Sequence, residues 1–157
     1  MNIRHAEAPD LASVMTLAAE VVGPERAGPL VRSHIERHHL LVAEEAGAVV
    51  GVLAYRTDWF QCTFVGLVAV REDVRRRGTA RALYKMLEDV SPSPRLYSST
   101  EETNAGAIQM HTALGFTPSV LDGREHKLVV RMKQPGMTAR ARRSYLAAAD
   151  KISVSGK

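Results

Sequence analysis

The stretch LVAVREDVRRRGTARALYKML, residues 67–87, decides the fold class of this chain, because it runs from an apolar strand through a cationic turn into an amphipathic helix. The strand is the β-branched run that ends at Val70, and the helix repeats apolar residues at helical spacing over residues 79–90. Gly78 and several arginines occupy the turn between them. A strand that leads into a helix through such a turn predicts a mixed α/β domain.

The same turn is predicted to bind a phosphate group. A helix N-terminus leaves backbone N–H groups without partners in the helix and carries about half a positive charge. Gly78 and Ala80 leave the backbone uncovered, and the arginines supply charge-assisted donors. The chain lacks G-x-x-x-x-G-K-[ST], and Gly78 has no glycine partners for G-x-G-x-x-G, which disfavours a nucleoside triphosphate or a dinucleotide. The arginines are Arg75, Arg76, Arg77 and Arg81.

Outward from this stretch, the pattern predicts alternating helices and strands. A strand at 2–6 precedes a helix capped by Asp10, and a second, shorter helix is expected from Pro29 to His38. Three strands of an antiparallel meander follow, and a helix that ends at Gly115 comes after the strand at 95–99. The meander is expected at 40–45, 48–56 and 62–70, the last helix at 104–114, and two final strands at about 117–121 and 125–132.

Two motifs in this order resemble those of the GNAT superfamily of N-acetyltransferases. The acetyl-CoA loop of that family reads [QR]-x-x-G-x-[GA] after a strand, and residues 75–80 match it as RRRGTA. A second family motif, N-x-x-A-x-x-[LM]-[YH]-x-x-x-G-F, is matched by Asn104, Ala107, Met110, His111, Gly115 and Phe116. The resemblance covers about residues 2–133 and implies an acetyl-CoA-dependent N-acetyltransferase.

The resemblance also implies the architecture. It predicts an α/β (α+β) domain over residues 1–133, with a mixed, mostly antiparallel sheet of six to seven strands flanked by about four helices. A β-bulge is expected to splay the fourth strand from the fifth and to open a slot for the acyl group. Residues 134–157 are expected to form a basic tail, helical or partly disordered.

The family's cofactor contacts can be transferred residue by residue. The pantetheine arm is expected to pair with the strand before the loop, and the backbone from Arg76 to Arg81 to hold the pyrophosphate. Asn104 is expected to bind the pantetheine or a bridging water, although capping its own helix is an alternative. The expected cofactor-binding residues are Val68, Ala69, Val70, Arg75, Arg76, Arg77, Gly78, Thr79, Ala80, Arg81 and Asn104.

For catalysis, the resemblance assigns proton donation to His111, where the family usually has a tyrosine. A histidine with a pKa of about 6.5 can protonate a thiolate whose conjugate acid has a pKa of about 8.5. A histidine that is only hydrogen-bonded in the core is the alternative, with Tyr97 or Tyr84 as substitute donors. No carboxylate lies on the fourth strand, so the general base stays open, with Glu101 and Glu102 acting through water as candidates.

The acceptor is expected between the first two helices and the sheet, and is a small molecule or a peptide with an amine. A metal site at His34 and His38 is disfavoured because no HExxH pattern or third ligand accompanies them. A non-catalytic acyl-CoA-binding module is the alternative function, since the fourth-strand carboxylate and the tyrosine are missing. The residues expected around the acceptor are Glu25, Arg26, His34, Glu36, His38, Trp59 and Phe60.

Composition and charge bear on whether the chain binds nucleic acid, spans a membrane or acts in the cytoplasm. The chain has 157 residues, of which 45% are hydrophobic and 24% charged, as in a folded globular protein. Its net charge of +4 resides in the tail, which argues against nucleic-acid binding. Cys62 is the only cysteine, and no apolar run is long enough for a membrane span, so we expect a cytoplasmic enzyme. A homodimer stays open, since Tyr145, Leu146 and Ile152 could pack on a neighbouring subunit.

Overall fold

The computed structural model describes residues 1–101, 103–119 and 126–132, and the expectations for residues 134–157 lie outside them. The described chain divides into two compact units. One comprises Met1–Arg56 and Val65–Val90, and the other comprises Thr57–Phe64 and the described residues from Ser91 onward. Each unit is treated by itself below.

The first unit holds three α-helices and four strands, of which β3 ends and β4 begins in the second unit. Two 3-10 turns, Ala8–Asp10 and Glu72–Val74, precede α1 and α3. The elements are β1 (Asn2–His5), α1 (Leu11–Val22), α2 (Pro24–Glu36), β2 (Leu40–Glu45), β3 (Ala48–Trp59), β4 (Cys62–Val70) and α3 (Thr79–Val90).

The second unit holds β5 (Arg95–Glu101), α4 (Ala105–Ala113), β6 (Thr117–Ser119) and β7 (His126–Met132). In sequence, α4 follows β5, and β7 pairs with both β5 and β6. Tyr97 of β5 and Thr117 of β6 both lie opposite Val130 of β7.

The described strands follow the order β1-β2-β3-β4-β5-β7-β6. The pairs β1–β2, β2–β3, β5–β7 and β6–β7 are all antiparallel. Seven strands and four α-helices confirm the predicted mixed, mostly antiparallel α/β fold. The predicted splay between the fourth and fifth strands concerns the relative placement of the two units, and it stays a prediction.

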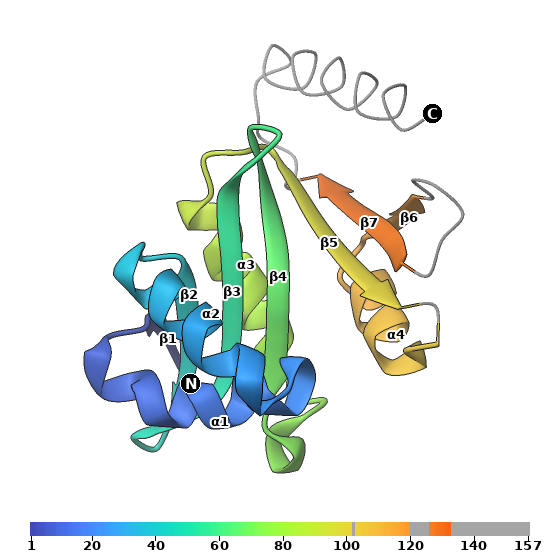
Figure 1. Cartoon of the computed structure of the whole chain (residues 1–157). Helices are drawn as coiled ribbons and strands as arrows, with labels where there is room; N and C mark the ends of the chain where they lie inside the picture. The colour runs from blue at the N-terminus through green and yellow to red at the C-terminus, as the bar shows by residue number, and fades with distance from the viewer. Residues whose placement is uncertain (102, 120–125, 133–157) are drawn as a thin grey trace. The chain divides into compact units, whose positions relative to one another are not determined.

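In the first unit, helices cover both faces of the strands (Figure 1). Alternate residues of a strand point to opposite faces, so Leu40, Val42 and Val52 share a face, and they pack with Val14 and Val31 of α1 and α2. The opposite face carries α3, whose Thr79 and Leu83 approach the strand backbone at Gly51. The core of this unit is therefore a sheet between two helical layers.

Helix α2 differs from the sequence expectation. It begins at Pro24, five residues before the predicted start, and Pro29 lies inside it. Pro24 suits the first helical position, where a missing N–H costs nothing. Gly28 is buried beside Met15 of α1, with 3.6 Å between the Met15 Cε and the position of an added Cβ. Packing of α2 on α1 therefore keeps the helix continuous through Gly28 and Pro29, although glycine and proline usually interrupt a helix.

Asp10 is the N-cap residue of α1, as predicted, but its side chain makes no capping bond to that helix. Its carboxylate accepts hydrogen bonds from the Arg4 guanidinium at 2.7 and 2.9 Å and from the Glu7 backbone N–H at 2.8 Å. The same guanidinium donates to Glu44 of β2 at 2.8 Å. Arg4 and the backbone of the 3-10 turn before α1 use the carboxylate that would otherwise bond to the start of the helix.

Replacing Gly51 with alanine is expected to lower the free energy of unfolding by about 1–3 kcal/mol, the usual cost of overpacking a core. A Cβ at this position would lie 2.9 Å from Thr79 Cγ2 and 3.3 Å from Leu83 Cδ1. Urea denaturation measures the change. Gly66→Ala is the matched control on β4, since an added Cβ there meets no atom within 4 Å. Equal stabilities of the two variants would contradict the tight contact.

Candidate functional site

The predicted phosphate loop lies in the first unit, between β4 and α3. A 3-10 turn at Glu72–Val74 leads from the strand into it, and two of its residues have left-handed backbone, with φ of +67° at Arg76 and +87° at Gly78. Glycine adopts such a φ at little cost, whereas a side chain on Arg76 is strained there. A Cβ on Gly78 would meet no atom within 4 Å, so the loop backbone borders open space at this residue.

The N-terminus of α3 is fixed against the strands. The Ala82 N–H donates to the Gly78 carbonyl at 2.9 Å, so the N–H groups of Thr79 and Ala80 precede the first helical hydrogen bond. The Thr79 side chain is buried over Gly51. The helix end therefore presents backbone donors and positive dipole charge at a defined position.

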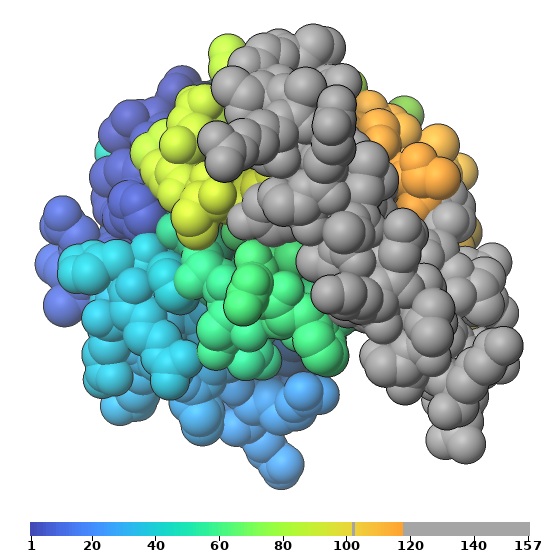
Figure 2. All heavy atoms as spheres, turned by 90° about the horizontal axis from the view of Figure 1, so that it is seen from above, coloured from blue at the N-terminus to red at the C-terminus, as the bar shows by residue number. Residues whose placement is uncertain are grey.

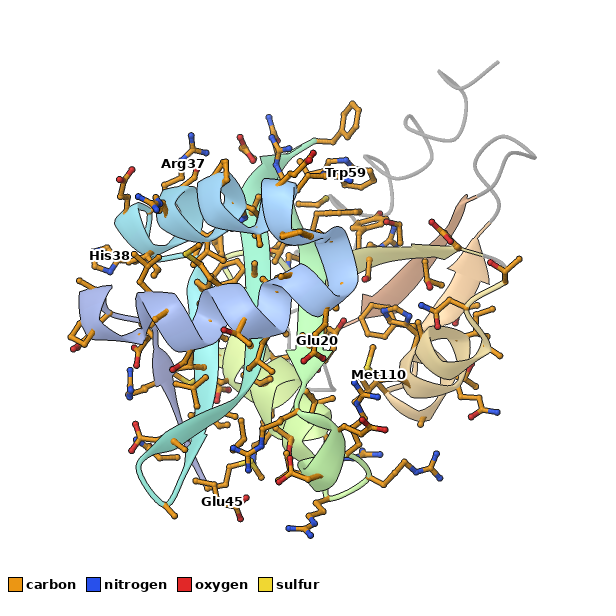
Figure 3. The ribbon with its side chains drawn as sticks, turned by 60° about the horizontal axis from the view of Figure 1, so that its bottom comes forward. Glu20, Arg37, His38, Glu45, Trp59 and Met110 are labelled. Atoms are coloured by element: carbon orange, nitrogen blue, oxygen red, sulfur yellow. The ribbon has the colours of Figure 1, made fainter. Side chains whose placement is uncertain are left out.

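The cationic side chains of the loop have different roles. Arg75 Nε donates to the Val70 carbonyl at 2.9 Å, and a terminal nitrogen of Arg75 lies 3.8 Å from Glu20 of α1. Figure 3 labels Glu20, which lies near the end of α1. Arg76, Arg77 and Arg81 are exposed. Arg75 thus has a defined contact within the loop, and all four arginines are exposed.

The strand expected to bind pantetheine ends in the same place. Ala69 belongs to the core of the first unit, while Val68 and Val70 are half-buried. Since the Val70 carbonyl accepts from Arg75, the end of the strand and the loop are joined by a side chain as well as by the backbone.

Asn104 lies in the second unit, at the start of α4. Its side-chain oxygen accepts a hydrogen bond from the Ala107 N–H at 3.0 Å. This is the geometry of a helix N-cap, which typically stabilises a helix by about 1 kcal/mol. Asn104 therefore caps α4, which is the alternative role expected from the sequence.

His111 lies on α4, and the end of that helix fixes its ring. The Phe116 N–H donates to the His111 carbonyl at 2.9 Å, and the Gly115 N–H donates to the Thr112 carbonyl at 3.0 Å. This pair of bonds closes the helix and places the Phe116 ring edge-on against His111, with 5.1 Å between ring centroids. His111 Nε2 lies 3.0 Å from Ser98 Oγ of β5.

Burial lowers the pKa of His111 below its usual value of 6.5, and the neighbouring Ala107 backbone opposes this shift. Only 4% of His111 is exposed, and the same fraction of Ser98. The imidazole is therefore mainly neutral at neutral pH. A neutral imidazole accepts a proton more readily than it donates one.

The alternative proton donors and general bases lie in surroundings that differ from those of His111. The Tyr97 hydroxyl accepts from Arg95 at 3.3 Å, and its ring packs on Trp59 with 4.9 Å between centroids. Tyr84 is fully buried. Glu101 is exposed at the end of β5, and Glu102 lies outside the described residues.

Of the residues expected around the acceptor, five lie in the first unit and two in the second. His34 Nδ1 lies 2.8 Å from the Leu30 carbonyl of its own helix. His38, which Figure 3 labels, follows the end of α2 and has a left-handed backbone with φ of +55°. Trp59 and Phe60 belong to the β3–β4 hairpin, whose tip reaches the surface seen in Figure 2, and 60% of Phe60 is exposed. Glu25, Arg26 and Glu36 are exposed.

Among the side chains of the described ranges, no group of three or more His, Cys, Asp or Glu residues is placed to hold a metal ion. No helix in the described part of the chain is long and apolar enough to cross a membrane.

The structure thus groups the loop residues in one turn of the first unit, and Asn104 and His111 on one helix of the second. Three residues at these places were missed by the sequence prediction: Gly51, Glu20 and Ser98. The alternation of residues in β5 puts Ser98 and Thr100 on one face, which is a signal for inward-facing hydroxyl groups. The sequence shows neither the partner of Ser98 nor the contact made by Gly51.

Acidification below pH 6.5 is expected to destabilise the wild type more than His111→Phe. The folded-state pKa of His111 is below its usual value, so the unfolded chain binds more protons in that range. The stability due to neutral His111 is therefore complete above pH 6.5 and is lost as the pH falls below it. Urea denaturation of both proteins across this range measures the difference, and identical slopes would contradict it.

Solved structures resemble this fold closely. An acetyltransferase of the GNAT family from Bacillus cereus is 28% identical, with a TM-score of 0.76, covering 85% of this chain and 97% of that chain. The ribosomal-protein-S18-alanine N-acetyltransferase from Escherichia coli is 19% identical, with a TM-score of 0.70 and coverages of 88% and 97%. The paia N-acetyltransferase from Thermoplasma acidophilum, solved with coenzyme A, is 13% identical, with a TM-score of 0.69 and coverages of 83% and 98%.

No curated protein matches the sequence. The sequence profile described as the acetyltransferase (GNAT) family matches residues 9–116. This match includes the loop at residues 75–80 and the second motif as far as Phe116. Because it spans more than half of the chain, and because the fold agrees, the chain belongs to the acetyltransferase (GNAT) family.

Proposed function

We propose that this chain transfers an acetyl group from acetyl-CoA to a primary amine of a small molecule or peptide, by direct attack in a ternary complex. The observation that carries the proposal is the loop before α3, where the left-handed Arg76 and Gly78 precede a helix N-terminus. Membership of the family supports the same chemistry.

The residues of the loop fit a pyrophosphate. Gly78 borders open space, the N–H groups of Thr79 and Ala80 precede the first helical bond, and exposed arginines flank these residues in the sequence. An anion at this place would accept backbone hydrogen bonds and would be stabilised by the helix dipole. Arg75 acts differently in this proposal, since its bonds to Val70 and Glu20 hold the loop rather than the ligand.

The contacts to the rest of the cofactor are assigned from the resemblance to the family. The pantetheine arm would pair with the backbone of residues 68–70, and Asn104 would contribute through its side chain or a water. Acetyl-CoA supplies the activated thioester. The protein would bind and orient acetyl-CoA. We assign to His111 the role of holding the proton that reaches the leaving sulfur.

The acceptor is proposed as an amine because the family acts on amines. The Escherichia coli neighbour is named for acetylating an alanine of ribosomal protein S18, and another neighbour, from Paenibacillus lautus, was solved with L-2,4-diaminobutyric acid. Both are under 25% identical to this chain, so they support a class of acceptor and not a compound. We place the activity in the cytoplasm and within residues 1–133, with the basic tail at 134–157 outside it.

Free thiol released from acetyl-CoA in the presence of a broad amine library tests the function. We expect thiol release that depends on the amine, with formation of the N-acetyl product by mass spectrometry. Tight binding of CoA without thiol release for any amine would instead indicate a non-catalytic acyl-CoA-binding module.

Gly78→Glu is expected to weaken CoA binding at least about tenfold more than Gly78→Gln. Both side chains meet the same backbone strain at a φ of +87° and extend into the same open space, but only glutamate brings a negative charge to the proposed pyrophosphate site. Isothermal titration calorimetry with CoA measures both affinities. Equal affinities of the two variants, or of Gly78→Glu and the wild type, would move the pyrophosphate away from this loop.

His111→Phe is expected to lower turnover by about 10²-fold, the usual scale for a group that transfers a proton, while CoA affinity is retained. Phenylalanine keeps an aromatic ring against Phe116 and removes both nitrogens. Steady-state kinetics and calorimetry separate the two effects. Wild-type turnover in the folded variant would remove His111 from the mechanism.

A further inference from the structure

The hydrogen bond between Ser98 and His111 is the observation with the most chemical content that the proposed function has not used. Ser98 Oγ lies 3.0 Å from His111 Nε2, within the range of a catalytic hydroxyl–imidazole pair. Both residues belong to the second unit, and β5 and α4 hold them at this distance. Each is 4% exposed, so bulk water competes little for the bond.

The direction of this bond depends on the tautomer of the ring, because the single proton of a neutral imidazole stands on either Nδ1 or Nε2. With the proton on Nδ1, Nε2 is the acceptor and the Ser98 hydroxyl donates to His111. This is the direction in which a proton can pass from Ser98 to the ring. The Phe116 ring lies edge-on to His111, with 5.1 Å between centroids, and the Phe116 N–H bonds to the His111 carbonyl.

We propose that Ser98 and His111 form a proton relay, in which the Ser98 hydroxyl is the group that exchanges protons with the reactants and His111 stores the proton behind it. This inference rests on the proposed acetyl transfer. It names a second proton-transferring residue and supplies the general base that the sequence left open.

The relay balances over one turnover. The acceptor ammonium gives a proton to Ser98 Oγ while the Ser98 hydroxyl proton moves to His111 Nε2, which forms imidazolium. The neutral amine then forms the C–N bond with the thioester carbonyl, and its second proton leaves to solvent. Cleavage of the C–S bond gives a thiolate, and the imidazolium returns its proton through Ser98 to the sulfur. One proton is released to solvent, and both side chains regain their starting state.

Ser98→Ala tests the relay, because it removes the hydroxyl and keeps the rest of the strand. We expect kcat to fall by about 10²-fold with little change in CoA affinity. Ser98→Thr retains a hydroxyl on a strand position and is expected to recover most of the activity. Thr112→Ala is the matched control on α4, since it removes an exposed hydroxyl that bonds the Ile108 carbonyl, and its kcat should equal that of the wild type.

The double variant Ser98→Ala/His111→Phe separates a relay from two independent roles. Residues that act as one unit give non-additive losses, so the double variant should lose no more than the worse single variant. Losses that multiply would overturn the relay. Mass spectrometry of the protein after exposure to acetyl-CoA supplies a further check, because an acetyl group on Ser98 would make it a nucleophile and would also overturn the relay.

The direction of the bond has a readout that does not depend on activity. In ¹⁵N-histidine-labelled protein, NMR at neutral pH should show His111 protonated on Nδ1 and unprotonated on Nε2. A proton on Nε2 would reverse the bond and overturn the proposal. If the wild type binds CoA but no amine in the library causes thiol release, the proposed function fails and the relay fails with it. If the wild type is active and the folded Ser98→Ala variant is equally active, only the relay fails.

Discussion

The close approach of α3 to β3 at Gly51 is the contact on which the first unit depends. Thr79 Cγ2 lies so near the strand that a Cβ on Gly51 would stand 2.9 Å from it. Because Thr79 is the first residue of α3, this contact fixes the end of the helix at which backbone donors are exposed. A glycine in the middle of a strand costs conformational entropy, and here that cost brings a helix N-terminus to a defined place beside the sheet.

The loop that precedes this helix uses its charges in two ways. Arg75 bonds to the Val70 carbonyl and lies near Glu20, so it joins the end of β4 to the loop and the loop to α1. Exposed ion pairs contribute little to stability, and the bond to a backbone carbonyl is the better defined of the two contacts. Arg76, Arg77 and Arg81 are also exposed at the protein surface.

Much of the fold could be predicted from the sequence because its strongest signals are local. The periodicity of α3 gave both ends of that helix, and the apolar run of β4 gave both ends of the strand. The start of α2 could not be predicted because tertiary packing on α1 overrides Pro29 and Gly28. The role of Asp10 was missed because its partner Arg4 comes from β1. In the same way, His111 was recognisable from its motif, whereas its bond to Ser98 depends on how β5 and α4 pack.

The exposed arginines of the loop also bear on how quickly a ligand arrives. Arg76, Arg77 and Arg81 lie close together in sequence at the positive end of a helix, and their fields add. A polyanion diffusing nearby is attracted over roughly one Debye length, about 8 Å at physiological ionic strength. The neutral balance of charge over residues 1–133 leaves this local field without a broad positive background. The association rate of a polyanionic ligand should therefore fall steeply with added salt, while its dissociation rate, governed by short-range backbone hydrogen bonds, changes much less.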